Sequence, residues 1–262
     1  MLELRGLSKT FDPGTVMAKQ VFDGLNLSVP GGQFVTIIGS NGAGKSTLFG
    51  AIGGSFLPDS GAVLIDGVDV TFWPPHRRAK WVGRLFQDPL MGTAPNMTLA
   101  ENLSLVYLRN HPDASFWGIT KKGKALLRDR VAMLGLGLEH RLDDRVGSLS
   151  GGQRQALTLL MATLVPPKVL LLDEHTAALD PATAEVVSRL TAEIVAREGL
   201  TCLMVTHNIA QALALGDRTI MMAGGKVMFD LSGQERASAT PQSLLERFKD
   251  AVAASDRMVF SA

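Results

Sequence analysis

One run of residues constrains the fold of this chain more than any other feature of its sequence: Gly39, Ser40, Asn41, Gly42, Ala43, Gly44, Lys45 and Ser46. The run matches the phosphate-binding loop pattern, in which four variable residues separate two glycines and Lys and Ser follow. The β-branched run Phe34–Ile38 before it is typical of a buried parallel strand, and Ser46–Gly53 predicts the start of a helix. A plain glycine-rich turn is the alternative, but it does not explain why strand, loop, Lys and Ser occur in this order.

The chemistry of such a loop is phosphate binding. Its glycines let backbone N–H groups wrap around β- and γ-phosphates, and the N-terminus of the following helix adds donors and a favourable dipole. Lys45 would neutralise phosphate charge, and the Ser46 hydroxyl would ligate Mg²⁺. We therefore predict a nucleotide site that extends from Gly39 to Thr47.

Composition excludes several classes of protein. The chain has 262 residues, 46% of them hydrophobic, which suits a globular protein with a substantial core. Lys and Arg number 26 against 25 Asp and Glu, and this net charge of +1 argues against a broad basic surface for nucleic acid. The single Cys202 excludes a disulfide framework, and no apolar run has the length of a membrane span or the form of a secretory signal. Composition therefore predicts a cytoplasmic α/β protein with no nucleic-acid partner.

Strand and helix patterns alternate along most of the chain. We predict strands at Leu2–Leu7, Val21–Val29, Phe34–Ile38, Ala62–Val68, Lys80–Phe86, Val169–Leu172 and Thr201–Val205, and a hairpin at Thr219–Met222 and Lys226–Phe229. Helices are predicted at Ser46–Gly53, Leu99–Leu108, Ala125–Leu134, Gln153–Leu164, Pro181–Arg197 and Pro241–Ala253, with loops at Pro74–Pro75, Asn110–Lys124 and Leu231–Glu235. The alternation predicts a largely parallel sheet with helices on both faces, interrupted by an all-helical insertion.

Two carboxylates follow an apolar strand. Val169–Leu172 is succeeded by Asp173 and Glu174, so burial of the strand would bring both acids to the carboxyl edge of the sheet, beside the phosphate loop. Asp173 suits a role at Mg²⁺, and Glu174 suits the general base that polarises an attacking water. An apolar run ending in Asp-Glu is commonplace by itself, but its pairing with a phosphate loop predicts a hydrolytic site.

A second anion-binding helix start occurs at Ser150, Gly151, Gly152 and Gln153, after Leu149. Nothing in the chain's own phosphate site requires it. This stretch, about twenty residues ahead of Asp173, resembles the signature motif of the ATP-binding cassette (ABC) ATPases. In that family the motif completes the ATP site of the opposite subunit, whereas a simple glycine-rich helix cap is the alternative.

Four further residues fit the same resemblance. Gln87 resembles the glutamine that touches Mg²⁺ and the attacking water, and Asp180, in Ala178-Leu179-Asp180, resembles the loop that communicates across the dimer. His207 resembles the switch histidine that contacts the γ-phosphate, and Phe11 the aromatic residue that stacks on adenine. Taken singly, each has an ordinary structural alternative.

The resemblance covers the chain from about Leu2 to Leu231. It implies an α/β fold, a P-loop NTPase with the ABC ATPase core: a mainly parallel sheet, an N-terminal antiparallel β region and a helical subdomain insertion. It implies one domain, 1–262, with a core at 1–87 and 166–262 and a helical signature subdomain at about 88–165. Its cofactors would be ATP and Mg²⁺, with catalysis by Glu174, His207 and Gln87 and metal contacts from Ser46, Gln87 and Asp173.

The resemblance also implies partners. A homodimer or a paired ABC subunit would sandwich two ATP molecules, and separate permease subunits and a substrate-binding protein would complete a bacterial importer. The chain would lie on the inner face of the cell membrane, docked through a groove at Gln87–Met97 with the apolar residues Leu90, Met91 and Met97. The alternatives are a non-transport ATPase, such as the iron–sulfur cluster assembly ATPase, and an ATP-binding scaffold without turnover.

One position departs from the family. His175 follows Glu174 where the family usually has proline. The histidine restores a backbone N–H that proline lacks and adds a titratable group. We hypothesise that His175 makes turnover pH-sensitive near neutrality. The run Asp173–Asp180 further resembles a subgroup that is encoded with permeases similar to those for branched-chain amino acids.

Overall fold

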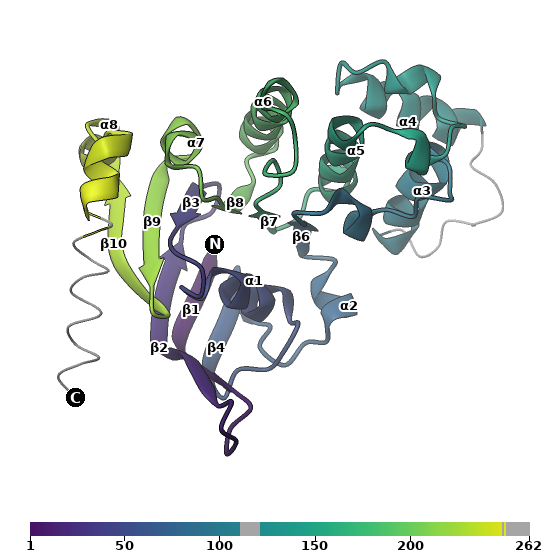
Figure 1. Ribbon diagram of the computed structural model, residues 1–262. Coiled ribbons are helices and arrows are strands. Elements are labelled where there is room, and N and C mark those ends of the chain that lie inside the picture. The colour runs from purple at the N-terminus through teal and green to yellow at the C-terminus, as the bar shows by residue number, and fades with distance from the viewer. Residues whose placement is uncertain (111–120, 248, 250–262) are drawn as a thin grey trace.

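Two β-sheets with a helix between them build the part of the molecule that contains the phosphate loop (Figure 1). The computed structural model describes residues 1–110, 121–247 and 249. The predicted α/β class with a mainly parallel sheet and an antiparallel N-terminal region is confirmed.

The larger sheet has six strands in the order β10-β9-β3-β8-β7-β6. Its strands are β3 (Phe34–Ile38), β6 (Val82–Leu85), β7 (Val169–Asp173), β8 (Thr201–Val205), β9 (Arg218–Ala223) and β10 (Lys226–Ser232). All neighbours pair in parallel except β9 and β10, which form the predicted antiparallel hairpin. Because β3 and β7 run in the same direction, the phosphate loop and the Asp173-Glu174 pair leave the sheet at the same edge.

The smaller sheet is antiparallel, in the order β2-β1-β4-β5. Its strands are β1 (Leu2–Phe11), β2 (Lys19–Val29), β4 (Ser60–Ile65) and β5 (Val68–Asp69). The prediction of one strand at Ala62–Val68 is wrong, because the chain reverses at Asp66 and Gly67, whose φ angles are 48° and 77°. Two successive positive φ angles are the geometry of a tight hairpin turn, for which Asp-Gly is a preferred sequence.

Helix α1 (Lys45–Gly53) packs between the two sheets (Figure 1). Its buried side chains share one hydrophobic cluster with both sheets, including Leu48, Phe49 and Ile52. The predicted loop at Pro74–Pro75 leads into a short helix, α2 (Pro75–Arg78). From there the buried Arg78 guanidinium donates to the carbonyls of Ala51 and Ile52. It therefore satisfies the C-terminal carbonyls of the helix that carries the phosphate loop.

The opposite face of the larger sheet is covered by helices α5 (Gly151–Thr163) and α6 (Pro181–Glu198). Helices α3 (Leu99–Asn110) and α4 (Lys121–Ala132) pack beside α5, to one side of the sheet (Figure 1). The loop predicted at Asn110–Lys124 falls largely on residues 111–120, outside the described residues, but its last part is wrong because α4 begins at Lys121. The remaining short helices are η1 (Pro89–Gly92), η2 (Leu138–His140), η3 (Val146–Ser148), α7 (Ile209–Ala214) and α8 (Gly233–Ala237).

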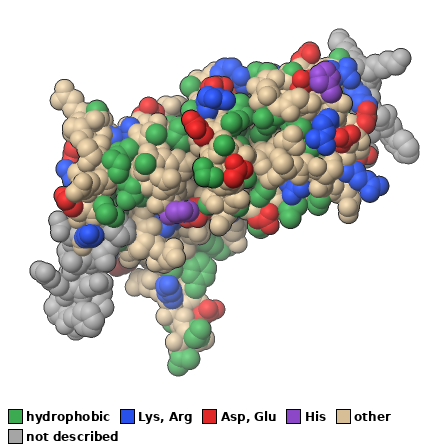
Figure 2. Space-filling model, turned by 45° about the horizontal axis from the view of Figure 1, so that its top comes forward, with side chains coloured by type: hydrophobic (Ala, Val, Ile, Leu, Met, Phe, Trp, Pro, Cys, Tyr) green, Lys and Arg blue, Asp and Glu red, His purple; other side chains and the backbone are tan. Residues whose placement is uncertain are grey.

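Two predictions concern the C-terminal part of the chain. The loop predicted at Leu231–Glu235 is wrong, since it contains the end of β10 and the start of α8. The helix predicted at Pro241–Ala253 is helical at 241–247 and 249, and its other residues lie outside the described ones. Across residues 1–110, 121–247 and 249, the structure contains no helix with the length and hydrophobicity of a membrane span. On the face of the molecule drawn in Figure 2, hydrophobic side chains are interspersed with acidic and basic ones.

Candidate functional site

The phosphate loop folds around its own lysine. The Lys45 ammonium donates to the carbonyl oxygens of Gly39 and Ser40 at 2.6 and 2.9 Å. Burial lowers the pKa of Lys45, and the negative charges of Glu174 and Asp173 oppose that shift. The cation is therefore held at the carboxyl edge of the sheet within the field of both acids.

Glycine at the start of α1 leaves the helix terminus free for an anion. Gly44 is the N-cap in a left-handed conformation (φ 97°), and no side chain caps the first turn. A Cβ on Gly44 would lie 2.9 Å from the Phe22 ring, and one on Gly39 would lie 2.3 Å from the Met222 carbonyl oxygen. Since no side chain competes for the N–H groups, the terminus is suited to bind phosphate.

Glu174 leaves β7 in a strained conformation that brings it to His207. Its φ angle of 44° is uncommon for a residue with a side chain, and its N–H donates to the Val205 carbonyl of β8. The Glu174 carboxylate lies 3.3 Å from Nδ1 of His207, whose side chain is 66% exposed. The predicted general base and the histidine predicted to contact the γ-phosphate therefore come together from two adjacent parallel strands.

The signature stretch begins α5 with a capping box. The Ser150 hydroxyl accepts from the Gln153 N–H, and the Gln153 side chain accepts from the Ser150 N–H. A Cβ on Gly152 would lie 1.9 Å from the Thr183 methyl group, so a larger residue there would force the Thr183 side chain of α6 to move. Asp180 caps α6 by accepting from the Thr183 N–H. Hydrogen bonding with the Thr183 side chain, and then with its backbone N–H, lowers the pKa of the Asp180 carboxyl. The signature stretch and the Asp180 loop are thus packed together.

A sequence profile described as ABC transporter matches residues 22–177. The chain belongs to this family. The tyrosine transport ATP-binding protein of Clostridioides difficile is 42% identical over 96% of this chain and 100% of that protein. An aliphatic sulfonates import ATP-binding protein of Agrobacterium fabrum is 37% identical over 88% of this chain and 79% of its own length.

Solved structures agree with these relatives. An ATP-binding cassette described as a dimer in a post-hydrolysis state, bound to ADP and Pi, superposes with a TM-score of 0.74 at 29% identity. That match covers 88% of this chain and 98% of the other. A second cassette of an ABC transporter, in its ADP conformation, superposes with a TM-score of 0.74 at 27% identity. This match covers 90% of this chain and 93% of the other. The predictions of an ABC ATPase and of its P-loop NTPase fold are confirmed, and these relatives give no support to the iron–sulfur alternative.

Two other predicted site residues of the cassette come from β6 and β1. Gln87 follows the end of β6 and is exposed. Phe11 ends β1, and its ring contacts the Phe56 ring edge-on, with centroids 5.2 Å apart. The Lys9 ammonium lies 5.5 Å from the Phe11 centroid. Their contacts with Mg²⁺ and adenine stay predictions.

The hypothesis of a neutral-pH switch at His175 is wrong, because the ring is buried. Burial lowers the pKa of His175 from 6.5 to about 4, so the ring does not change charge near neutrality. Nε2 of His175 lies 3.1 Å from the Thr191 hydroxyl, which itself donates to the Val187 carbonyl of α6. Since the hydroxyl hydrogen is used there, Nε2 carries the proton and donates to Thr191. His175 thus ties the chain after Glu174 to α6.

The same burial predicts acid sensitivity of the fold. A histidine with a lowered pKa in the folded state binds more protons when unfolded, so stability falls as pH drops below about 6.5 towards 4. Between pH 7 and pH 5 we expect the free energy of unfolding to fall by about 2 kcal/mol more in the parent than in His175→Gln. Urea unfolding at both pH values measures this, and equal losses in the two proteins would contradict it.

Sequence reasoning missed Gln211. Its Nε2 donates to the hydroxyls of Thr176 and Ser188, and its Oε1 accepts from the Thr206 hydroxyl beside His207. Gln211 therefore connects the His207 loop to the segment after Glu174 and to α6. A signal existed, since Asn208 and Gln211 are spaced as an N-cap and its partner after a strand, and Asn208 does accept from the Gln211 N–H.

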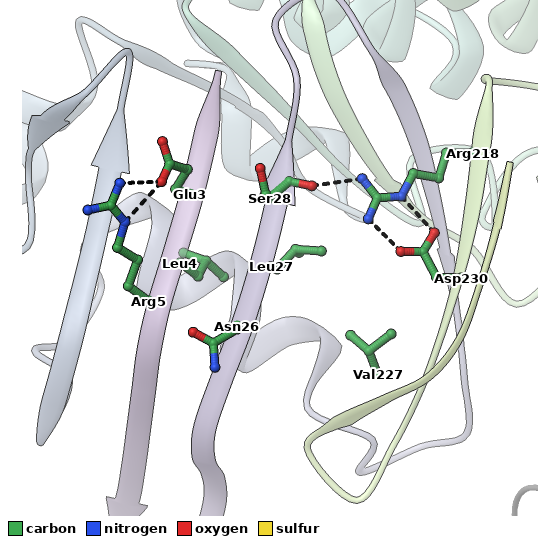
Figure 3. Close-up of a pocket in the computed structure, with 9 residues that line it drawn as sticks. All are labelled: Glu3, Leu4, Arg5, Asn26, Leu27, Ser28, Arg218, Val227 and Asp230. Carbon is green, nitrogen blue, oxygen red and sulfur yellow. Dashed lines mark hydrogen bonds and ion pairs between the residues drawn. The ribbon is translucent and has the colours of Figure 1, made fainter.

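A surface pocket elsewhere is lined by β1, β2, β9 and β10 (Figure 3). Its charged groups are already paired: Arg218 contacts Asp230 through two nitrogens and donates to the Ser28 carbonyl, and Arg5 contacts Glu3. The bond from Arg218 to Ser28 joins the hairpin of the larger sheet to the antiparallel sheet, whereas the other two pairs each lie within one sheet. We assign the pocket a structural role.

Proposed function

We propose that this cassette is the ATP-hydrolysing subunit of a bacterial importer whose cargo is an amino acid. The observation that carries the proposal is the similarity to the tyrosine transport ATP-binding protein, which extends over essentially the whole length of both chains. The contact between Glu174 and His207 supports turnover and argues against a scaffold that only binds ATP.

ATP would be bound between two subunits. The phosphate loop of one subunit, residues Gly39 to Thr47, would hold the phosphates, and Ser150 to Gln153 of the other subunit would close over them. The Glu174 carboxylate would accept a proton from the attacking water, and His207 would hold both this carboxylate and the γ-phosphate. Gln87 and Asp180 would sense the phosphate and the partner subunit, and Phe11 would stack on adenine. Binding favours the closed dimer, and hydrolysis removes that preference.

The donor set suits Mg²⁺. The Ser46 hydroxyl, the Asp173 carboxylate and the Gln87 amide offer oxygen ligands, which this hard cation prefers. Among the described residues, no group of three or more His, Cys, Asp or Glu side chains forms a metal site. These residues would therefore hold the ion together with the phosphates, and the ion would supply neutralisation of phosphate charge.

The partners follow from the same proposal. A second cassette and a pair of permease subunits, of the type similar to branched-chain amino acid permeases, would complete the transporter with a substrate-binding protein. The cassette would be one domain with the core and helical subdomain given above, attached to the inner face of the membrane. Leu90 and Met91 of η1 are 46% and 68% exposed, and Met97 is half-buried, so the first two suit an apolar permease contact.

Uptake tests the proposal. Cells carrying Glu174→Gln in place of the parent cassette should lose uptake of labelled tyrosine, while uptake of a labelled alkanesulfonate and of spermidine should be unchanged. A permease should co-purify with the tagged parent cassette from detergent-solubilised membranes. Recovery of sulfur-assembly factors in place of a permease, or unchanged tyrosine uptake, would contradict the proposal.

A further inference from the structure

Arg84 is a second cation at the Asp173 carboxylate. It lies in β6, where Arg84 pairs with Leu171 of the parallel strand β7. Its Nη2 is 3.3 Å from Oδ2 of Asp173, and the two side chains are 24% and 18% exposed. The contact is therefore largely shielded from water, where charges interact more strongly than on an open surface.

The sheet directs both side chains to the face that carries the phosphate loop. Side chains alternate between the faces of a strand, and Val82 and Leu171 belong to the cluster around α1. Arg84 is two residues from Val82, and Asp173 is two residues from Leu171, so both point to that face. Lys45 lies at the start of α1 within the field of Asp173. Asp173 therefore contacts one cation, Arg84, and acts electrostatically on a second, Lys45.

The Arg84 guanidinium is held loosely. Only one of its nitrogens reaches Asp173, at the long end of hydrogen-bond distance. An arginine that donates two parallel hydrogen bonds to a carboxylate is held more strongly. Its central carbon, Cζ, lies 4.7 Å from the centroid of the Phe86 ring. Its Nε is buried and makes no hydrogen bond within the described part of the chain. A cation with so few bonds can leave the carboxylate.

We propose that Arg84 is the built-in counter-cation of Asp173 and sets how strongly nucleotide binding depends on Mg²⁺. The inference rests on the proposed role of Asp173 at the metal. Without Mg²⁺, Arg84 keeps the carboxylate from repelling the phosphates. With Mg²⁺, it competes with the ion for Asp173. Arg84 acts through Asp173 and is thus a positioning residue. An uncharged side chain in its place would make nucleotide binding more dependent on Mg²⁺.

The experiment measures ADP affinity by calorimetry in EDTA and in saturating Mg²⁺. The quantity compared is the dissociation constant in EDTA divided by the dissociation constant in Mg²⁺. Arg84→Met should raise this ratio about tenfold over the parent. If that variant folds poorly, Arg84→Gln replaces the cation with a polar group and should raise the ratio by the same factor. Arg84→Lys should restore the parent ratio. The matched control is Arg77→Met, which removes an exposed guanidinium that lies 3.8 Å from the Trp73 ring, outside the site.

A double substitution tests the contact itself. In an Asp173→Asn background, Arg84→Met should leave the ratio unchanged, because the carboxylate for which Arg84 and Mg²⁺ compete is gone. A ratio in Arg84→Met equal to that of the parent would overturn the inference, as would an equal rise in both backgrounds. A parent protein whose ADP affinity does not respond to Mg²⁺ would overturn the proposed metal site, which is a separate result.

Discussion

Replacement of Glu174 by Gln is expected to lower ATP hydrolysis by about 100- to 1,000-fold, while ATP binding is retained. The carboxylate lies 3.3 Å from His207 at the end of β7, and an amide of the same shape preserves that contact but cannot accept the proton of an attacking water. Because the γ-phosphate then persists, the closed dimer should accumulate. Phosphate release measures the first effect, and light scattering with and without ATP measures the second.

The control for this variant is Glu185→Gln on α6, an exposed carboxylate outside the site. It makes the same chemical change and should hydrolyse ATP at the parent rate. Turnover of Glu174→Gln at the parent rate would show that another group is the base. If Glu174→Gln does not hydrolyse ATP but stays a monomer when ATP is bound, Glu174 would remain the base and the two-subunit site would be contradicted.

The parts of the site that lie within one continuous motif could be predicted from the sequence. The phosphate loop and the Asp173-Glu174 pair each combine a buried strand with the polar residues directly after it, so strand burial alone brings them to the sheet edge. The Ser150 and Asp180 caps are likewise local, since each accepts from an N–H three residues ahead.

The parts of the site that depend on tertiary packing could not be predicted from the sequence. The burial of His175 follows from its place under α6 against Thr191, and a histidine beside a catalytic acid gives no sign of that in the sequence. The Arg84 contact depends on which strand pairs with β6 and in which register. The error at Ala62–Val68 has another cause: the Asp66-Gly67 turn signal was present, but the apolar residues on both sides read as one strand.

Replacement of Lys45 by Ala is expected to weaken nucleotide binding by roughly 10- to 100-fold, the range of one hydrogen bond to a charged group. The ammonium now donates to Gly39 and Ser40, so in the nucleotide complex it would exchange at least part of this pairing for phosphate oxygens. Its lowered pKa shows that burial disfavours the charge, and an arriving phosphate compensates for that burial. Titration with ADP and with ATP measures the loss.

The physical interpretation of that loss depends on how it divides between ligand and loop. Removal of the ammonium also leaves the Gly39 and Ser40 carbonyls without this donor, so Lys45→Ala can weaken binding by loosening the loop. Lys45→Gln keeps an N–H donor without the charge, so recovery of most of the affinity there would assign the loss to the loop, and a loss as large as in Lys45→Ala would assign it to phosphate charge. The matched control is Lys80→Ala, which removes an exposed lysine outside the loop and should bind as the parent does. Unchanged affinity in Lys45→Ala would contradict the phosphate-loop assignment on which the rest of the site depends.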